Sequence, residues 1–480
     1  MHRILAFIVA AALSMTLLCG WSGLPHWASA AEPAAGLSAP LRVGAAKVNF
    51  ACDDKMQVGG HIVAQYVQGQ EGELRAVATV IEQPGSGKFA IVACDVLFVT
   101  AEMVDRAAVQ IEKSCGIPSA HLLVNATHTH GAPSTVRIHD SRAEPEFVEN
   151  VVTSIVRAAE EANAHLADDC RFLFHLGQEP NVGSNSRLLM SDGMISWGNT
   201  NDPTARPTGP FDPELPVWVF RRPADRGNPL VSVIYNHSTH TVGSLRPNVR
   251  SPSFYGLAAQ ALEEKWGVPV CFLEGASGSS HNGGRPVADL IADLERDVTA
   301  GVDQAVERPV PRIVAIKRPF RFRVRTFDEA TEDRKVLDYM QAHAPGALDV
   351  VARVFREARQ FLKPEQGKER ETTNQVILIG DVALVGVSAE FFTSLGMEIK
   401  RRSPYPHTYV AELANDWIGY LPDREAHRLG GYQTWMGTHS FAEIGTGERV
   451  VDQVVGMLEE LAAQYPPSKP AEAKAAGKGQ

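Results

Sequence analysis

Hydrophobic positions along the chain alternate between two periods, which predicts strands and helices in turn. The apolar run at 89–99 (FAIVACDVLFV) predicts a strand, the amphipathic stretch 101–114 a helix, and 121–127 (HLLVNAT) a second strand. Further helices are predicted at 145–166, 254–266, 285–305, 389–401 and 447–464, and further strands at 229–237, 268–275, 315–325 and 375–387. The alternation predicts an α/β fold, a single domain with a mixed sheet and helices on the sheet faces.

The two ends of the chain carry different patterns. Arg3, an apolar run at 4–18 and the small residues Ala28-Ser29-Ala30 occur in the order of an export signal, which predicts cleavage after residue 30. Segments 31–40 and 466–480 are rich in Pro, Ala and Gly and lack apolar periodicity, so they are predicted to be a disordered linker and tail. The domain is therefore expected to occupy 41–465, where no Pro/Gly-rich linker divides the chain.

Composition and charge narrow the class of protein. The chain has 46 Lys and Arg against 56 Asp and Glu, a formal charge of −10, with 44% hydrophobic and 21% charged residues, which are globular proportions. The basic residues are scattered, so nucleic-acid binding is not expected. No run downstream of the signal is as apolar as the signal itself, and no transmembrane segment is expected in the mature chain. The oligomeric state is not fixed by these features.

Cysteine usage does not indicate a disulfide framework or a zinc-finger site. Removal of the signal leaves five cysteines and no C-x-x-C spacing, and the odd number leaves at least one thiol free unless chains pair. The five are Cys52, Cys94, Cys115, Cys170 and Cys271. Cys94 and Cys271 lie in apolar runs, so buried thiols are favoured over bridges.

Polar side chains that could do chemistry gather where predicted strands end. His128 and His130 follow the run at 121–127, and a continued strand would project both imidazoles from one face. His240 lies just after the strand at 229–237. The imidazole nitrogens of His128 and His130 could bind one metal ion, or one ring could be a ligand and the other an acid or base. Because open α/β sheets gather their ligand sites at the carboxyl ends of strands, two histidine clusters there favour a functional site over exposed polar strand ends.

Three further segments carry candidate groups. The loop at 275–284 is rich in small residues and holds Ser279 and Ser280, but no G-x-S-x-G nucleophile elbow is present. Glu390 directly follows an apolar run, where it could ligate a metal or simply favour a helix N-terminus. Tyr420 and Tyr432 lie in IGYLPDREAHRLGGYQTW, where packing in the core is the alternative to a role in the site.

Taken in order, these motifs resemble the neutral/alkaline, non-lysosomal ceramidase family. The resemblance begins at RVGAAKV (42–48), continues through NATHTHGAP and the segments that contain His240 and Glu390, and ends in NDWIGYLP. It covers about residues 41–465, the catalytic domain of that family. The immunoglobulin-like C-terminal domain of the long ceramidases is expected to be absent, as in short bacterial relatives.

The resemblance implies a zinc site and a reaction. It implies the following roles: His128, His240, Glu390 and Tyr420 as ligands of Zn²⁺, His130 facing the substrate amide, and Tyr432 as a second active-site tyrosine. The implied activity is that of a zinc-dependent amidohydrolase, which cleaves an N-acylsphingosine-like lipid to a fatty acid and a sphingoid base. Zinc suits this reaction because it acidifies water and polarises a carbonyl.

The sequence departs from the family pattern at three places. The family's Gly-Asp-Val-Ser-Pro-like loop is Gly278-Ser279-Ser280-His281-Asn282 here, which makes Ser279 and Ser280 candidates in a shifted register. Its Asn-Arg pair is Asn185-Ser186-Arg187, so Arg187 is a displaced candidate, and its Pro-Gly-Glu is Ser388-Ala389-Glu390. These changes leave open a zinc hydrolase of another amide or ester, and a non-catalytic binding protein that keeps the metal site.

Export yields the first testable expectation. The protein recovered outside the cytoplasm, in the periplasm or the medium, should have the intact mass of a chain that begins at Ala31, because the charged residue, the apolar run and the A-x-A site occur in the required order. Intact-mass spectrometry measures this. A mass that includes Met1, or a lipid adduct on Cys19, would contradict it.

Overall fold

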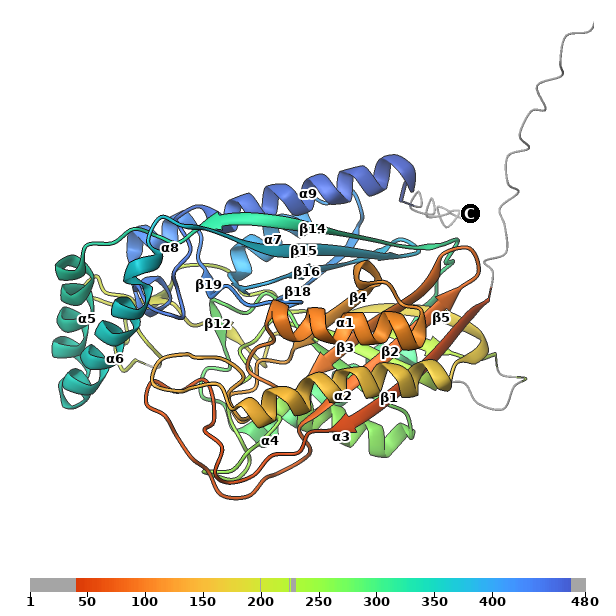
Figure 1. Cartoon of the computed structure of the whole chain (residues 1–480), viewed down its shortest axis with the longest axis horizontal. Helices are drawn as coiled ribbons and strands as arrows, with labels where there is room; N and C mark the ends of the chain where they lie inside the picture. The colour runs from red at the N-terminus through yellow and green to blue at the C-terminus, as the bar shows by residue number, and fades with distance from the viewer. Residues whose placement is uncertain (1–39, 199, 224, 226–229, 468–480) are drawn as a thin grey trace, which may run out of the picture. The chain divides into compact units, whose positions relative to one another are not determined.

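The computed structural model describes residues 40–198, 200–223, 225 and 230–467. The export signal at 1–30, and the predicted linker and tail apart from residues 40, 466 and 467, lie outside these residues. The described residues belong to one compact unit. It is built in four layers, in which two sheets pack face to face and helices cover the outer face of each sheet (Figure 1). The α/β prediction is confirmed, but with two sheets, and each has helices on only one face.

The larger sheet is mixed and contains most of the strands. Its order is β11 (Val270–Glu274), β10 (Leu230–His237), β9 (Glu214–Arg221), β5 (Ala167–Gln178), β1 (Leu41–Asn49), β2 (Arg75–Gln83), β3 (Gly87–Cys94) and β4 (Leu122–Ala126), with β13 (Val306–Glu307) also paired to β5. β3 pairs with β4, and β10 with β11, in parallel, while the remaining neighbours are antiparallel. The carboxyl ends of both parallel pairs therefore lie close to the predicted histidine segments.

The alternation of side chains explains why these strands are apolar at nearly every position. In β2, Ala78 and Val80 pack against helices α1 (Ala101–Cys115) and α2 (Pro145–Ala164), while Val77 and Ile81 face the second sheet. At the other end of the sheet, helices α3 (Ser253–Trp266) and α4 (Val287–Gln304) cover β9, β10 and β11 in the same way. A strand that is buried on both faces needs apolar residues on both, which is the pattern of a continuous run.

The second sheet completes the inner core. Its order is β14 (Ile313–Arg323), β15 (Glu369–Ile379), β16 (Val382–Val387) and β18 (His407–Ala411), of which only β16 and β18 pair in parallel. Helices α7 (Thr393–Arg402) and α9 (Thr446–Gln464) cover its outer face (Figure 1). β16 and β18 bring the segments that follow them, which begin at Ser388 and Glu412, to the same edge as the ends of β4 and β11.

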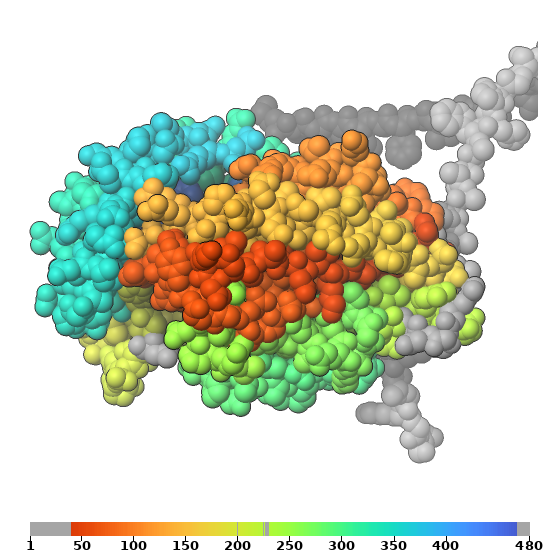
Figure 2. Space-filling view, turned by 60° about the horizontal axis from the view of Figure 1, so that its bottom comes forward, coloured from red at the N-terminus to blue at the C-terminus, as the bar shows by residue number. Residues whose placement is uncertain are grey.

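The remaining elements surround this edge. They are the helices α5 (Glu329–His343), α6 (Leu348–Leu362) and α8 (Arg424–Leu429), the 3₁₀ turns η1 (Ser119–His121), η3 (Pro345–Ala347), η4 (Lys363–Glu365) and η5 (Tyr432–Thr434), and the short strands β6 (Ser184–Asn185), β7 (Leu188–Leu189), β8 (Arg206–Pro207), β12 (Ser280–His281), β17 (Glu390–Phe391) and β19 (Tyr420–Leu421). Figure 2 shows the α5–α6 pair, in turquoise and light blue, at one end of the unit, beside α2 in gold and the segment between β1 and β2 in red-orange.

The predicted elements agree with the structure best where the apolar period is long. The helices expected at 101–114, 145–166, 254–266, 285–305 and 447–464 are α1, α2, α3, α4 and α9 to within a few residues. The helix expected at 389–401 begins only at Thr393, because 390–391 instead form β17. Helices α5 and α6 were not predicted. The five described cysteines are free, and no helix of the described residues is long and apolar enough to cross a bilayer.

A buried ion pair ties α3 to the larger sheet, and its removal should cost stability. Arg75 Nη1 on β2 lies 2.5 Å from Glu263 Oε2, and both side chains are nearly inaccessible to solvent. Glu263→Ala should lower the free energy of unfolding by about 3–5 kcal/mol, because it leaves the Arg75 guanidinium buried without that partner. Denaturant unfolding measures the loss. Glu161→Ala, which breaks an exposed i,i+4 pair with Arg157 on α2, should change it by less than about 1 kcal/mol; equal effects of the two variants would contradict the argument.

Candidate metal centre and the adjoining cavity

His128 and His130 reach the site from the loop after β4. A strand that continued through these residues would have projected both imidazoles from one face, but β4 ends at Ala126 and His128 has a φ of 61°, in the left-handed region that residues other than glycine rarely adopt. The turn nevertheless brings the two rings together, with His130 Nε2 3.4 Å from His128 Nε2. Such a backbone is retained only where the surrounding contacts require it.

The three histidines of the centre share one hydrogen-bond arrangement. Each Nδ1 faces a main-chain carbonyl: His128 that of Leu97 at 3.2 Å, His130 that of Gly60 at 3.1 Å, and His240 that of Ser277 at 3.3 Å. A carbonyl oxygen only accepts, so Nδ1 carries the proton of each neutral ring and Nε2 keeps its lone pair. All three lone pairs then face one another, since His240 Nε2 also lies 2.9 Å from His128 Nε2.

Glu390 and Tyr420 are brought to the same point by a short parallel pairing. β17 and β19 pair Glu390 directly with Tyr420. Tyr420 Oη lies 3.0 Å from His240 Nε2, and Glu390 Oε2 lies 3.6 Å from His128 Nε2. The other carboxylate oxygen, Glu390 Oε1, accepts a 3.0 Å hydrogen bond from the indole of Trp417, which fixes the orientation of the group.

The protonation states of these groups follow from their burial. Desolvation lowers the pKa of His128 to about 4 and lowers the pKa values of His130 and His240 well below the usual value, with His128 adding to the effect on both. Protons therefore cannot relieve the repulsion between the lone pairs near neutral pH. Burial also raises the pKa of Glu390 to about 8 and that of Tyr420 well above 10, because it disfavours the charged form of each group.

The donor set fits a zinc ion. Tetrahedral coordination with bonds of about 2.0–2.2 Å places ligand atoms about 3.3–3.6 Å apart. His240 Nε2 lies 2.9 Å from His128 Nε2 and 3.0 Å from Tyr420 Oη. Glu390 Oε2 lies 3.6 Å from His128 Nε2 and 3.7 Å from His240 Nε2. Neutral imidazoles held by carbonyls, a carboxylate held by an indole and a phenol suit this metal. His128, His130 and His240 also meet the geometry of a three-histidine group, so distance alone does not separate His130 from the ligands.

A glycine makes room for the backbone of Glu390. A Cβ atom on Gly278 would lie 2.7 Å from the main-chain oxygen of Glu390 and 2.9 Å from its carbonyl carbon, closer than real Cβ contacts. The small-residue loop after β11 therefore passes directly against the backbone of the β17 strand. This is the physical reason that the loop needs glycine at this position.

A cavity of about 740 Å³ adjoins the metal centre. His130, His240 and Tyr420 form its floor, and Tyr432 and Trp197 form an aromatic wall in which the two rings stack at 4.6 Å. The polar part of the lining, called the polar wall below, comes from Ser184, Asn185, Ser186, Ser280, His281 and Asn282. A volume of this size is typical of a site for a small organic molecule or for part of a larger one.

The other predicted site residues divide between the cavity and the surrounding core. Tyr432 and Ser280 line the cavity. Tyr432 Oη lies 2.8 Å from His139 Nε2, and the Ser280 hydroxyl donates to the carbonyl of Ser238. Ser279 does not line it, because its hydroxyl bonds to the backbone N–H and the hydroxyl of Thr393 at the start of α7.

Arg187 also lies outside the lining. Its guanidinium donates to Gln433 Oε1 at 2.8 Å and to the carbonyls of Ala426 and Gly430 at 3.2 Å and 2.6 Å. The residue is buried behind the segment that carries Tyr432 and holds that segment in place. Its position is that of a supporting residue, and nothing brings its guanidinium to the cavity surface.

Several residues of the site did not stand out in the sequence. His61 and Trp197 line the cavity from loops without periodicity, which gave no signal. Glu412 follows β18 as Glu390 follows β16, so the strand-end rule could have found it. Its carboxylate accepts hydrogen bonds from the main-chain N–H groups of Ser277 and Phe391 at 3.0 Å and 2.6 Å. Glu412 thereby joins the loop whose Ser277 carbonyl faces His240 to β17, which contains Glu390.

Comparisons with known proteins agree with the predicted resemblance at the level of the fold. No family model matches the chain, and no curated protein does. Among solved structures, the neutral ceramidase from Pseudomonas aeruginosa is 17% identical with a TM-score of 0.67, and the match covers 90% of this chain and 76% of that one. A ceramidase complexed with C2 is 18% identical with a TM-score of 0.67, covering 90% and 77% of the two chains. The chain therefore has the fold of the neutral ceramidase structures.

Proposed function

We propose that the chain is an exported zinc-dependent hydrolase that cleaves the amide bond of N-acylsphingosine-like lipids to a fatty acid and a sphingoid base. One observation carries the proposal: two imidazoles, a carboxylate and a phenol, each held by a second hydrogen-bond partner or by strand pairing, converge at the floor of the cavity. The likeness in fold to ceramidase structures supports the substrate class.

In this proposal His128, His240, Glu390 and Tyr420 hold the metal. Zinc supplies Lewis-acid polarisation of an amide carbonyl and acidifies water when it is bound. His130 has its Nδ1 proton fixed on the Gly60 carbonyl, so its Nε2 lone pair is free to take a proton at the cavity floor and to return it to the leaving amine. Its low pKa keeps it in the unprotonated, accepting form near neutral pH.

Tyr432 and the aromatic wall orient the substrate. The hydroxyl of Tyr432 is fixed by His139, and its ring is fixed by the stack on Trp197. Binding of a substrate therefore costs little side-chain entropy at this residue. The apolar faces of the wall suit the hydrocarbon part of a lipid amide. His240 and Tyr420 are buried, which strengthens the electrostatic interactions of these groups.

A second candidate is a zinc hydrolase of another amide or ester. The polar wall formed by Asn185, Ser280, His281 and Asn282 favours it, because these groups could bind polar groups beyond the hydroxyls and the amide that an N-acylsphingosine carries. A screen of N-acylsphingosine against short N-acyl amino sugars and esters separates the two candidates. Zinc binding without turnover of any of them would instead favour a binding protein.

The ligand assignment predicts the effect of removing one imidazole. His128→Ala and His240→Ala should each remove the bound zinc and lower hydrolysis of a labelled N-acylsphingosine to background, because three remaining donors would leave the ion incompletely held. Metal content by plasma emission spectrometry and released fatty acid are the two readouts. His165→Ala is the matched control, since this exposed histidine ends α2 far from the centre in the fold. Full zinc content in either ligand variant would remove that residue from the site.

The loop serines should not be indispensable. Ser279→Ala and Ser280→Ala should each retain measurable hydrolysis, because both hydroxyls are already used within the protein: Ser279 with Thr393, and Ser280 with the Ser238 carbonyl. Turnover per bound zinc is the quantity to compare with the unaltered protein. Complete loss in a variant that keeps its zinc and its circular-dichroism spectrum would show that this serine carries essential chemistry.

A further inference from the structure

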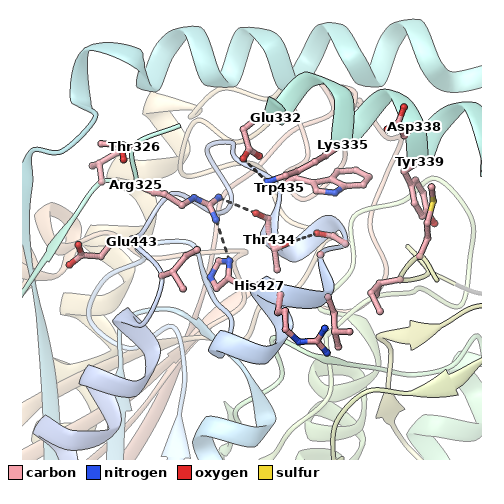
Figure 3. Close-up of a pocket in the computed structure, with 18 of the residues that line it drawn as sticks. Arg325, Thr326, Glu332, Lys335, Asp338, Tyr339, His427, Thr434, Trp435 and Glu443 are labelled. Atoms are coloured by element: carbon pink, nitrogen blue, oxygen red, sulfur yellow. Dashed lines mark hydrogen bonds and ion pairs between the residues drawn. The ribbon is translucent and has the colours of Figure 1, made fainter. Parts of the chain in front are cut away.

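A second cavity of about 670 Å³ lies behind the wall of the first. The two cavities share one segment of chain: Tyr432 and Gln433 line the cavity at the metal centre, whereas Gly431, Thr434 and Trp435 line the second. Most of the remaining lining comes from the end of β14, from α5 and from the end of α8, as Figure 3 shows, and residues 193–195, Gly367, Glu443 and Ile444 complete it. No part of the proposed metal site belongs to it.

The inner end of this cavity holds an arginine without a counter-ion. Arg325 donates to Thr434 and Ser440 carbonyls at 3.0 Å and 3.2 Å and lies 3.3 Å from His427 Nδ1 (Figure 3), but no carboxylate oxygen of the described residues lies within 4.0 Å of its guanidinium. Its Nε is buried without a hydrogen-bond partner. Arg75 in the core is instead paired with Glu263 at 2.5 Å. Arg187 also has only neutral acceptors, but it does not line the cavity, whereas Arg325 does. An unpaired guanidinium that is partly removed from water costs free energy, and pairing with an anion would reduce that cost.

The groups around Arg325 make this end of the cavity positive. His427 is half-buried beside it, and burial together with the charges of Arg325 and Arg187 lowers the pKa of His427 to about 3, so the ring is neutral. Burial also lowers the pKa of Arg325 itself, more than the attraction of Glu332 raises it. The nearest cavity carboxylate, Glu332, is already paired with Lys335 at 2.7 Å. The field at this point is therefore that of an uncompensated cation.

The remaining walls restrict what kind of anion fits. Ile195, Trp435 and Leu429 present apolar surface to the cavity, and the carboxylates of Asp338 and Glu443 lie at its lining as well. A compact, doubly charged ion such as phosphate would be repelled by these acids and would leave the apolar walls unfilled. A singly charged head on an apolar body matches both features, because the head pairs with the guanidinium and the body contacts the apolar side chains.

We propose that this cavity is a binding site for an organic monocarboxylate, with the carboxylate on Arg325 and the hydrocarbon part against Ile195, Leu429 and Trp435. The site is separate from the metal centre but shares the 431–435 segment with it. A carboxylate bound here therefore contacts the turn that carries Tyr432 from the opposite side.

Hexanoate, hexan-1-ol and inorganic phosphate are suitable probes, each titrated into the zinc-loaded protein by calorimetry at pH 7.5. Hexanoate should bind with a dissociation constant of about 1 mM or below. At tenfold excess over that constant it should raise the apparent Tm by about 1–3 °C. Hexan-1-ol and phosphate should each bind at least about tenfold more weakly, because the first lacks the charge and the second lacks the apolar body.

Variants locate the site. Arg325→Gln should weaken hexanoate binding at least about tenfold, whereas Arg157→Gln, which removes an exposed arginine of α2, should leave it unchanged. Leu429→Trp fills the cavity and keeps the guanidinium, so it provides a test if Arg325→Gln does not fold; it should weaken binding similarly. His128→Ala should retain hexanoate binding, which excludes the metal centre as the place where the carboxylate binds.

Three results would overturn the proposal. Hexanoate binding that survives both Arg325→Gln and Leu429→Trp, or that is lost in folded His128→Ala, would place the carboxylate elsewhere. Phosphate that binds as tightly as hexanoate would make the cavity a site for inorganic anions only. The absence of any hexanoate binding up to about 10 mM would show that the protein tolerates the unpaired Arg325 without a ligand.

Discussion

The hydrogen bonds from imidazole Nδ1 atoms to main-chain carbonyls are the constraint on which the centre depends. Leu97, Gly60 and Ser277 supply these carbonyls from three different loops, so the direction of each lone pair is set by the path of the backbone. Rigid strands fix those paths, because the loops after β3 and β11 leave the sheet at the edge where β4 and β10 also end. The two-sheet core thus determines the chemistry through three carbonyl oxygens.

A layer of buried carboxylates supports this arrangement from below. Glu412 binds the backbone on both sides of the centre, and Glu274 accepts a hydrogen bond from Thr241 close to His240. Burial holds the pKa values of both groups well above the usual range, and repulsion adds to it, from Glu412 and Glu390 on Glu274 and from Glu390 on Glu412. Carboxyl groups in such a dry environment are good hydrogen-bond partners and poor ions, so they position the loops without competing for a cation.

Much of this could be predicted from the sequence, for identifiable reasons. Long apolar periods located the core strands and helices, and the rule that ligands gather at strand ends located His128, His240 and Glu390. The backbone at His128 could not be predicted, because a left-handed residue inside a histidine motif has no compositional signal. Helices α5 and α6 were not predicted, although the apolar residues of α6 recur at the helical period and are buried on one face. The position of Ser279, buried away from the cavity, depends on Thr393, more than a hundred residues away.

The pairing of Glu390 with Tyr420 has a consequence for how the protein is made. A slip of one residue in that short ladder would present Phe391 in place of Glu390, so the carboxylate and the phenol enter the centre together or not at all. Both come from the last quarter of the chain, whereas the two imidazoles come from the first half. Of the four proposed ligands, a growing chain therefore contains only the two imidazoles until residue 390 is added, and the whole donor set exists only once residue 420 is in place.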